Sequence, residues 1–98
     1  MARVELAVAA VDDVEDLIRT HSLPADTRAR IARSLRGLEQ FPLMGPALSG
    51  RWEGFRFLLG AWRWLLLVYV FIEFEDRVVV VTIQDARSPA GASIDAAS

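Results

Sequence analysis

The sequence predicts a single α+β domain of order βααβββ, in which a helical hairpin packs on one face of a small, mainly antiparallel sheet. Two observations carry this prediction. The first half of the chain repeats its apolar residues at helical spacing, whereas the second half is made of aromatic and β-branched runs. With 98 residues the chain has room for one core, and its 53% of hydrophobic residues lies far from the composition of disordered proteins. Because the helices precede the strands instead of alternating with them, the class is α+β.

The first half of the chain predicts one strand and two helices. Residues 4–8 alternate weakly, as a short strand does, and residues 10–20 place apolar side chains on one helical face and acidic ones on the other. A break at residues 21–24 precedes a second helix, which should end near Gln40 because Pro42 disfavours its continuation. The two helices are predicted to form a hairpin.

The second half predicts three strands, at residues 55–59, 63–74 and 78–83. The turns between them are too short for crossover connections, so the strands should form an antiparallel meander. We assign residues 1–87 to the folded domain. Residues 88–98 are small and polar, and are expected to form a frayed or disordered tail.

The central strands are apolar on both faces. Residues 64–72 and 78–81 do not alternate between apolar and polar side chains, as a half-exposed strand should. The helical hairpin can cover one face, and no other segment looks long enough to cover the second. We therefore expect a partner over this face, either a peptide from another protein or a second copy of the chain. The alternative is that sheet twist and edge loops cover it.

Composition excludes several classes of protein. The chain has no cysteine, so it has neither disulfides nor a thiolate metal site. It contains no glycine-rich phosphate loop and no metal-ligand spacing, so no cofactor or metal is expected. The most apolar stretch, residues 57–72, is divided by Arg63 and is too short to span a bilayer. Without a signal peptide as well, the protein is expected to be cytoplasmic.

All eleven basic residues are arginines, although the net charge is −2. Four of them lie on or near the predicted meander: Arg51, Arg56, Arg63 and Arg87. If the strand ends gather at one rim, these guanidinium groups could bind RNA phosphate and stabilise charge on a scissile phosphate. Trp52 and Trp62 interleave with them and could stack on bases. The alternative is that the arginines are solvated strand ends and the tryptophans belong to the core.

The same region carries a family resemblance. Its pieces are, in order, Leu38-x-x-Phe41-Pro42, Gly45, Leu48-x-Gly50, Gly54-Phe55-Arg56-Phe57-Leu58, Trp62-Arg63 and Ile83-x-Asp85-x-Arg87. This order and spacing resemble the RelE/ParE superfamily, the toxins of bacterial type II toxin–antitoxin pairs, over about residues 4–88. The resemblance implies a growth-inhibiting toxin that is neutralised by an antitoxin peptide.

The resemblance implies one of two activities. RelE-like toxins cut mRNA on the ribosome, where the 2′-hydroxyl attacks the adjacent phosphate, whereas ParE-like toxins inhibit DNA gyrase and need no acid–base chemistry. By resemblance Arg56, Arg63 and Arg87 fall near the phosphate-holding positions. We expect mRNA cleavage, with Arg63 and Arg87 in the catalytic set. Gyrase inhibition and a non-toxic binding module that kept the fold are the alternatives.

Proton transfer is the point at which the sequence departs from the family. The lysines of many members are missing, and the position that often holds histidine is Ala86. Arginine is no ordinary base, since its pKa lies above about 12. Glu53, next to the arginines, is the best candidate for the base, ahead of Tyr69, Asp85 and His21. His21 lies in the predicted interhelical turn, far along the chain from the arginines, and is expected to cap a helix or face solvent.

Overall fold

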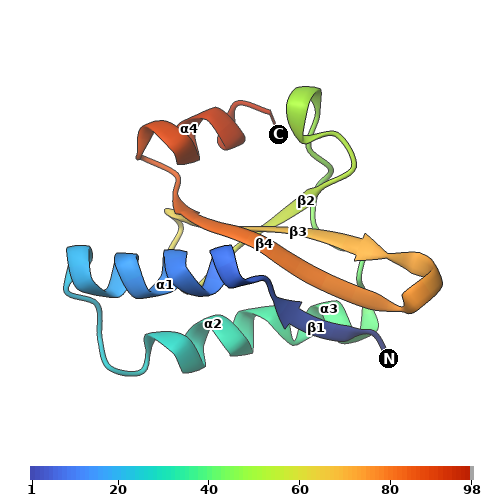
Figure 1. The fold of residues 1–98 in the computed structure, drawn as a ribbon, viewed down its shortest axis with the longest axis horizontal. Coiled ribbons are helices and arrows are strands. Elements are labelled where there is room, and N and C mark those ends of the chain that lie inside the picture. Colours follow the sequence, from blue (N-terminus) through green and yellow to red (C-terminus); the bar gives the residue numbers. More distant parts are fainter. Residues whose placement is uncertain (98) are drawn as a thin grey trace.

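The computed structural model describes residues 1–97 and confirms the α+β class. Its elements follow in the order β1 (Arg3–Leu6), α1 (Val8–His21), α2 (Thr27–Leu35), α3 (Gly37–Gln40), β2 (Arg56–Leu59), β3 (Leu65–Ile72), β4 (Arg77–Asp85) and α4 (Pro89–Asp95), with single turns of 3₁₀ helix η1 (Gly50–Trp52) and η2 (Glu73–Glu75). Helices α1 to α3 lie on one side of the sheet and α4 on the other (Figure 1). The predicted helical hairpin and three-stranded meander are therefore present, and α4 is an addition to them.

The four strands form one sheet in the order β1-β4-β3-β2. Strands β2, β3 and β4 are antiparallel neighbours, and β1 joins the edge parallel to β4. The pairing of Leu65 with Asp85 places the start of β3 beside the end of β4. This end of the sheet is where the candidate site lies.

Helix α1 continues the sheet edge where β1 stops. The amide of Ala7 donates to the carbonyl of Val80, and beyond this point α1 lies beside β4 in place of a strand. The Asp13 carboxylate on α1 accepts hydrogen bonds from the Thr82 hydroxyl at 2.7 Å and the Ile83 amide at 3.0 Å. An acidic side chain thus satisfies a strand edge that would otherwise lack an acceptor.

The main core lies between the sheet and the helices α1 to α3. It is built from apolar side chains at helical spacing, Val14, Ile31, Leu35 and Leu38, packed on Leu65, Leu67, Tyr69, Val78, Val80 and Ile83 of the sheet. The predicted second helix is interrupted at Arg36, which separates α2 from α3. Gly37 follows the interruption, and a Cβ there would lie 2.9 Å from the tip of the exposed Met44 side chain, which is free to shift.

The expected disordered tail is wrong for residues 89–95, which form α4. The Ser88 hydroxyl accepts a hydrogen bond from the Gly91 amide at 3.0 Å and caps the helix, and Pro89 occupies its first turn. Gly91 is buried so tightly that a Cβ would collide with the Asp85 carbonyl. Small residues let this short helix approach the sheet closely. The same small residues had predicted a disordered tail, because composition does not distinguish the two. Ser98 lies outside the described residues.

The second face of the sheet is covered by the chain itself where β3 begins, and it stays partly open farther along, where Val70 and its partner Val79 are half-buried. Leu66 and Val68 of β3 are 0% exposed. They pack against Ile94 of α4 and Leu48 of the loop before β2, with Trp52 at the margin. Helix α4 and the loop before β2 together cover Leu66 and Val68, although each segment is too short to cover them alone. The partner expected over this face stays a prediction, now confined to its half-buried part.

Candidate active site

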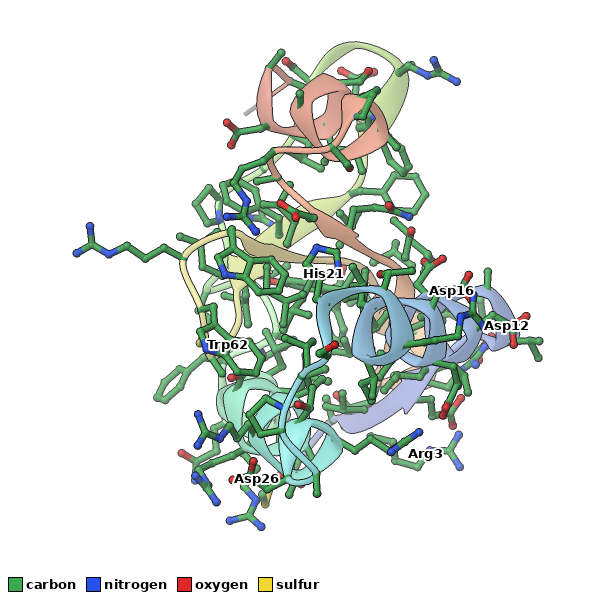
Figure 2. The ribbon with its side chains drawn as sticks, turned by 90° about the vertical axis from the view of Figure 1, so that its left-hand side faces the viewer. Arg3, Asp12, Asp16, His21, Asp26 and Trp62 are labelled. Carbon is green, nitrogen blue, oxygen red and sulfur yellow. The ribbon has the colours of Figure 1, made fainter. Side chains whose placement is uncertain are left out.

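The candidate site lies at the end of the sheet where β3 begins and β4 ends. His21 is the last residue of α1, Asp85 is the last residue of β4, and Trp64 precedes β3. Arg87 follows β4 by two residues. Figure 2 looks onto this end of the molecule and shows His21 at the near end of α1, with Trp62 in the turn between β2 and β3. We call His21, Trp64, Asp85 and Arg87 the His21–Asp85 site.

Asp85 is the centre of the site. Its residue is only 8% exposed, yet its carboxylate accepts four hydrogen bonds, three of them from Arg87. The Arg87 Nε and backbone amide donate to Oδ1 at 2.9 and 2.8 Å, and Arg87 Nη2 donates to Oδ2 at 3.0 Å. The Arg87 guanidinium, followed by the other donors, holds the pKa of Asp85 well below its usual range against the opposing effect of burial. The carboxylate is therefore ionised at neutral pH.

The ionised Asp85 fixes the orientation of His21. Its Oδ2 lies 2.9 Å from His21 Nε2, and an ionised carboxylate only accepts hydrogen bonds, so Nε2 carries a proton. His21 Nδ1 faces the Thr20 hydroxyl at 2.9 Å. That hydroxyl also donates its one proton to the Asp16 carbonyl at 2.8 Å. The Thr20 oxygen can therefore only accept a hydrogen bond from Nδ1.

A stack of aromatic rings supports the imidazole. The His21 ring lies 5.2 Å from Trp64 at an angle of 15°, and Trp64 lies 5.6 Å from Trp62 at 14°. The Arg87 guanidinium sits 4.8 Å over Trp64, and the Arg30 guanidinium sits 5.6 Å over Trp62. Cations over indole faces are attracted by the ring quadrupole. A nucleobase could therefore stack on Trp62, as the sequence predicted, only by displacing Trp64 or Arg30.

The structure brings two of the four predicted arginines to this site. Arg87 belongs to it, and Arg63 is exposed in the adjoining turn between Trp62 and Trp64. Arg56 is engaged elsewhere, since its Nη1 donates to the carbonyls of Leu43 and Gly45 and ties the preceding loop to β2.

Arg51, the fourth, lies on η1 and lines a hollow with residues of α4, on the other side of the sheet from α1.

Three other predicted candidates lie apart from the site. Glu53 directly follows η1, which lies on the α4 side of the sheet, opposite α1 (Figure 1). Trp52 packs edge-on against Phe55 at 5.6 Å and belongs to the second core. Tyr69 is buried, its hydroxyl accepts a hydrogen bond from the Gly45 amide at 3.0 Å, and burial raises its pKa. These contacts give Trp52 and Tyr69 structural roles.

His21 is the residue that sequence reasoning misplaced. It was expected only to cap a helix or face solvent, but it shares the Asp85 carboxylate with Arg87. Its signal was the position of the chain's one histidine at the end of a helix that begins directly after the first strand. The position of His21 could be predicted only with the parallel pairing of β1 with β4, because this pairing aligns the end of α1 with the end of β4.

No metal or membrane feature accompanies the site. Within residues 1–97, no group of three or more histidine, aspartate or glutamate side chains is arranged to hold a metal ion. Among the helices of the same residues, none has the length and apolar character needed to cross a bilayer.

Comparison with known proteins shows the fold. The sequence matches no protein-family profile and no curated protein sequence. The structure is similar to the solution structures of two conserved hypothetical proteins of Helicobacter pylori, HP0894 and HP0892, each with a TM-score of 0.58. The sequence identities are 21% and 18%; the alignments cover 85% and 94% of this chain and 92% and 99% of theirs. The shared architecture extends over nearly the whole length of both.

Proposed function

We propose that this chain is the toxin of a type II toxin–antitoxin module and that it inhibits growth by cleaving mRNA at the ribosome. The observation that carries the proposal is the hydrogen bond between His21 and Asp85 beside Arg87. It supplies a proton-transfer group at the sheet end where the RelE/ParE resemblance implies phosphate binding. Gyrase inhibition needs no such group, so this geometry favours the ribonuclease.

The site fits cleavage by the neighbouring 2′-hydroxyl. His21 Nδ1 takes the proton of that hydroxyl, and the ionised Asp85 stabilises the imidazolium that forms. The 2′-oxygen then bonds to phosphorus while the bond to the 5′-oxygen breaks, which leaves a 2′,3′-cyclic phosphate. The imidazolium returns its proton to the leaving 5′-oxygen.

The two arginines of the sheet end hold the phosphate in this scheme. Arg87 is 64% exposed on its side chain and uses only Nε and Nη2 for Asp85, so its Nη1 group remains for a ligand. Arg63 is exposed in the next turn and makes no ion pair within residues 1–97. Guanidinium groups stabilise charge that develops on the phosphate oxygens in the transition state.

The proposed toxin is neutralised by an antitoxin peptide. Because Leu66 and Val68 are already covered, a peptide on this face would bind over its half-buried part at Val70 and Val79 or displace α4. Co-expression with the product of a neighbouring short reading frame tests this part, and a stable complex is the expected result. A second copy of the chain in its place would indicate a homodimer.

The nuclease is tested by inducing the chain in growing bacteria and mapping new mRNA 5′ ends within minutes. Fresh ends inside translated reading frames are expected for the native chain and for Glu53→Gln, and are expected to disappear for His21→Gln. Arrested growth with intact mRNA would contradict the nuclease and direct the search to gyrase. Normal growth at full expression would contradict the toxin.

A further inference from the structure

The aromatic stack of the site continues onto the surface of α2. Trp62 stacks on Trp64 on one side of the turn, and Arg30 of α2 reaches over the Trp62 ring. Arg30 also donates to Asp26 at 3.0 Å, which holds its guanidinium in place while leaving its Nη atoms outside that bond. The site is thereby physically connected to a helix that carries none of its proposed catalytic groups.

Helix α2 is rich in arginine and has no acidic residue of its own. Arg28 is neutralised by Glu15 of α1, and Arg30 is partly neutralised by Asp26. Arg33, one turn after Arg30, is exposed and makes no ion pair with any of the residues 1–97. Arg30 and Arg33 share Asp26 as their acidic neighbour, so this side of α2 keeps a net positive charge.

A shallow hollow of about 350 Å³ separates α2 from the turn between β2 and β3. It is lined by Asp26, Arg30, Arg33, Ser34 and Ala61. The two residues that follow Ala61 are Trp62 and Arg63, so the hollow opens beside the exposed arginine of the site. Figure 2 shows Asp26 and Trp62 on the same side of the molecule, with Arg3 on the other.

We infer that the α2 face formed by Arg30 and Arg33 binds the phosphate backbone of single-stranded RNA and leads the strand past Trp62 to the His21–Asp85 site. Planar guanidinium forks match phosphate oxygens, and aromatic rings interleaved with arginine are typical of surfaces that bind single strands without reading sequence. Trp64 and Arg30 cover the two faces of Trp62, so a base stacks on this indole only after Arg30 moves aside. The inference rests on the proposed function, because RNA as the ligand comes from it.

The test measures binding directly instead of cleavage. Arg33→Gln is compared with Arg3→Gln, which removes the same charge from an exposed arginine that makes no ion pair within residues 1–97 and lies away from Trp62. A fluorescent single-stranded RNA oligonucleotide is titrated with each purified full-length chain over a range of salt concentrations. Arg33→Gln should weaken binding by about three- to fivefold, the size of one exposed charge contact. It should also reduce the slope of log affinity against log salt by about 0.7, the value for one phosphate of a single strand.

Arg3→Gln should leave both the affinity and the salt slope at the native values. An equal loss of RNA affinity in Arg33→Gln and Arg3→Gln would overturn the inference, because it would show that binding depends on the net charge of the protein alone. Native affinity in Arg33→Gln, or no RNA binding by the native chain, would overturn it as well. RNA binding that depends on Arg33 in a chain that cuts no mRNA in cells would uphold the binding surface and reject the nuclease, so the two failures are distinguishable.

Discussion

His21 and Asp85 are 64 positions apart in the chain, yet His21 Nε2 lies 2.9 Å from Asp85 Oδ2. The contact arises because α1 takes over the edge of β4 where β1 stops, so both elements end at the same end of the sheet. It ties the helical layer to the last strand and also orients the imidazole. The same bond is therefore expected to matter for stability and for chemistry, and variants can separate the two effects.

Replacing Asp85 with asparagine should destabilise the fold. The asparagine amide would point donors at the Arg87 guanidinium or at His21 Nε2, which both need an acceptor. We expect the free energy of unfolding to fall by about 1.5–3 kcal/mol, the range for hydrogen bonds to a charged group. Urea denaturation at pH 7 measures it. Asp12→Asn, which changes an exposed carboxylate on the outer face of α1, is the matched control and should alter stability little.

The stability gained from Asp85 should depend on pH in a defined direction. Its pKa is lower in the folded chain than in the unfolded one, so the contribution is complete above the unfolded value of about 4. It is lost as the pH falls through the folded pKa. The difference in unfolding free energy between the native chain and Asp85→Asn should thus be present at about pH 5 to 6 and shrink below about pH 4. A difference that grew on acidification would contradict the ionised carboxylate.

His21→Gln should abolish most of the proposed RNA cleavage while the protein stays folded. Glutamine keeps a donor for Asp85 but has no group that takes up a proton near neutral pH, so the loss should reach about 10²- to 10⁴-fold in rate. Single-turnover cleavage of mRNA on purified ribosomes measures it, with circular dichroism as the check on folding. A folded His21→Gln chain with native cleavage rates would remove the imidazole from the mechanism.

The sequence predicted the fold well because its signals are local. Helical spacing over residues 10–20, the apolar strands and the short turns each act within a few residues, and together they permit few architectures. The failures concern short segments and long-range pairing. Leu48 and Ile94 cover the second face only in combination, and neither segment has a periodic pattern of its own.

Only the part of the site that depends on residues close together in the chain was predicted. Asp85 and Arg87 are neighbours in sequence, so their pairing at a strand end was foreseeable, and Arg63 lies in a turn that the meander already placed. His21 depended on the parallel pairing of β1 with β4, which no local pattern encodes. Arg56 has the same residue type as the site arginines, but its environment is set by the Leu43 and Gly45 carbonyls.

The arginines should divide into two groups in a growth assay. Arg63→Ala and Arg87→Ala are each expected to relieve growth inhibition, because both lie at the proposed phosphate site. Arg51→Ala should remain toxic, since Arg51 lies on η1 beside α4. Arg87→Ala should also lower the melting temperature, because Asp85 loses the two hydrogen bonds that the Arg87 side chain donates. Backbone donation from residue 87 can persist in the variant, so the chain should still fold.

Expression levels of the three chains need to be equal for this comparison. Full toxicity of Arg63→Ala would exclude it from phosphate binding, and loss of toxicity in Arg51→Ala at equal expression would place the phosphate contacts on the other side of the sheet.

Ile94→Ala tests whether α4 is an integral part of the fold. Ile94 is 3% exposed and packs on Leu66 and Val68, so shortening it leaves a cavity over the second face. We expect a loss of about 2–4 kcal/mol in the free energy of unfolding, as for other buried isoleucines cut to alanine. Ser93→Ala, an exposed change on the same helix, is the control for helix content and should be nearly neutral. If Ile94→Ala were as stable as the native chain, α4 would contribute no packing and the face beneath it would be available to a partner. A large loss instead means that a partner binding there must first displace α4 and replace the contacts of Ile94.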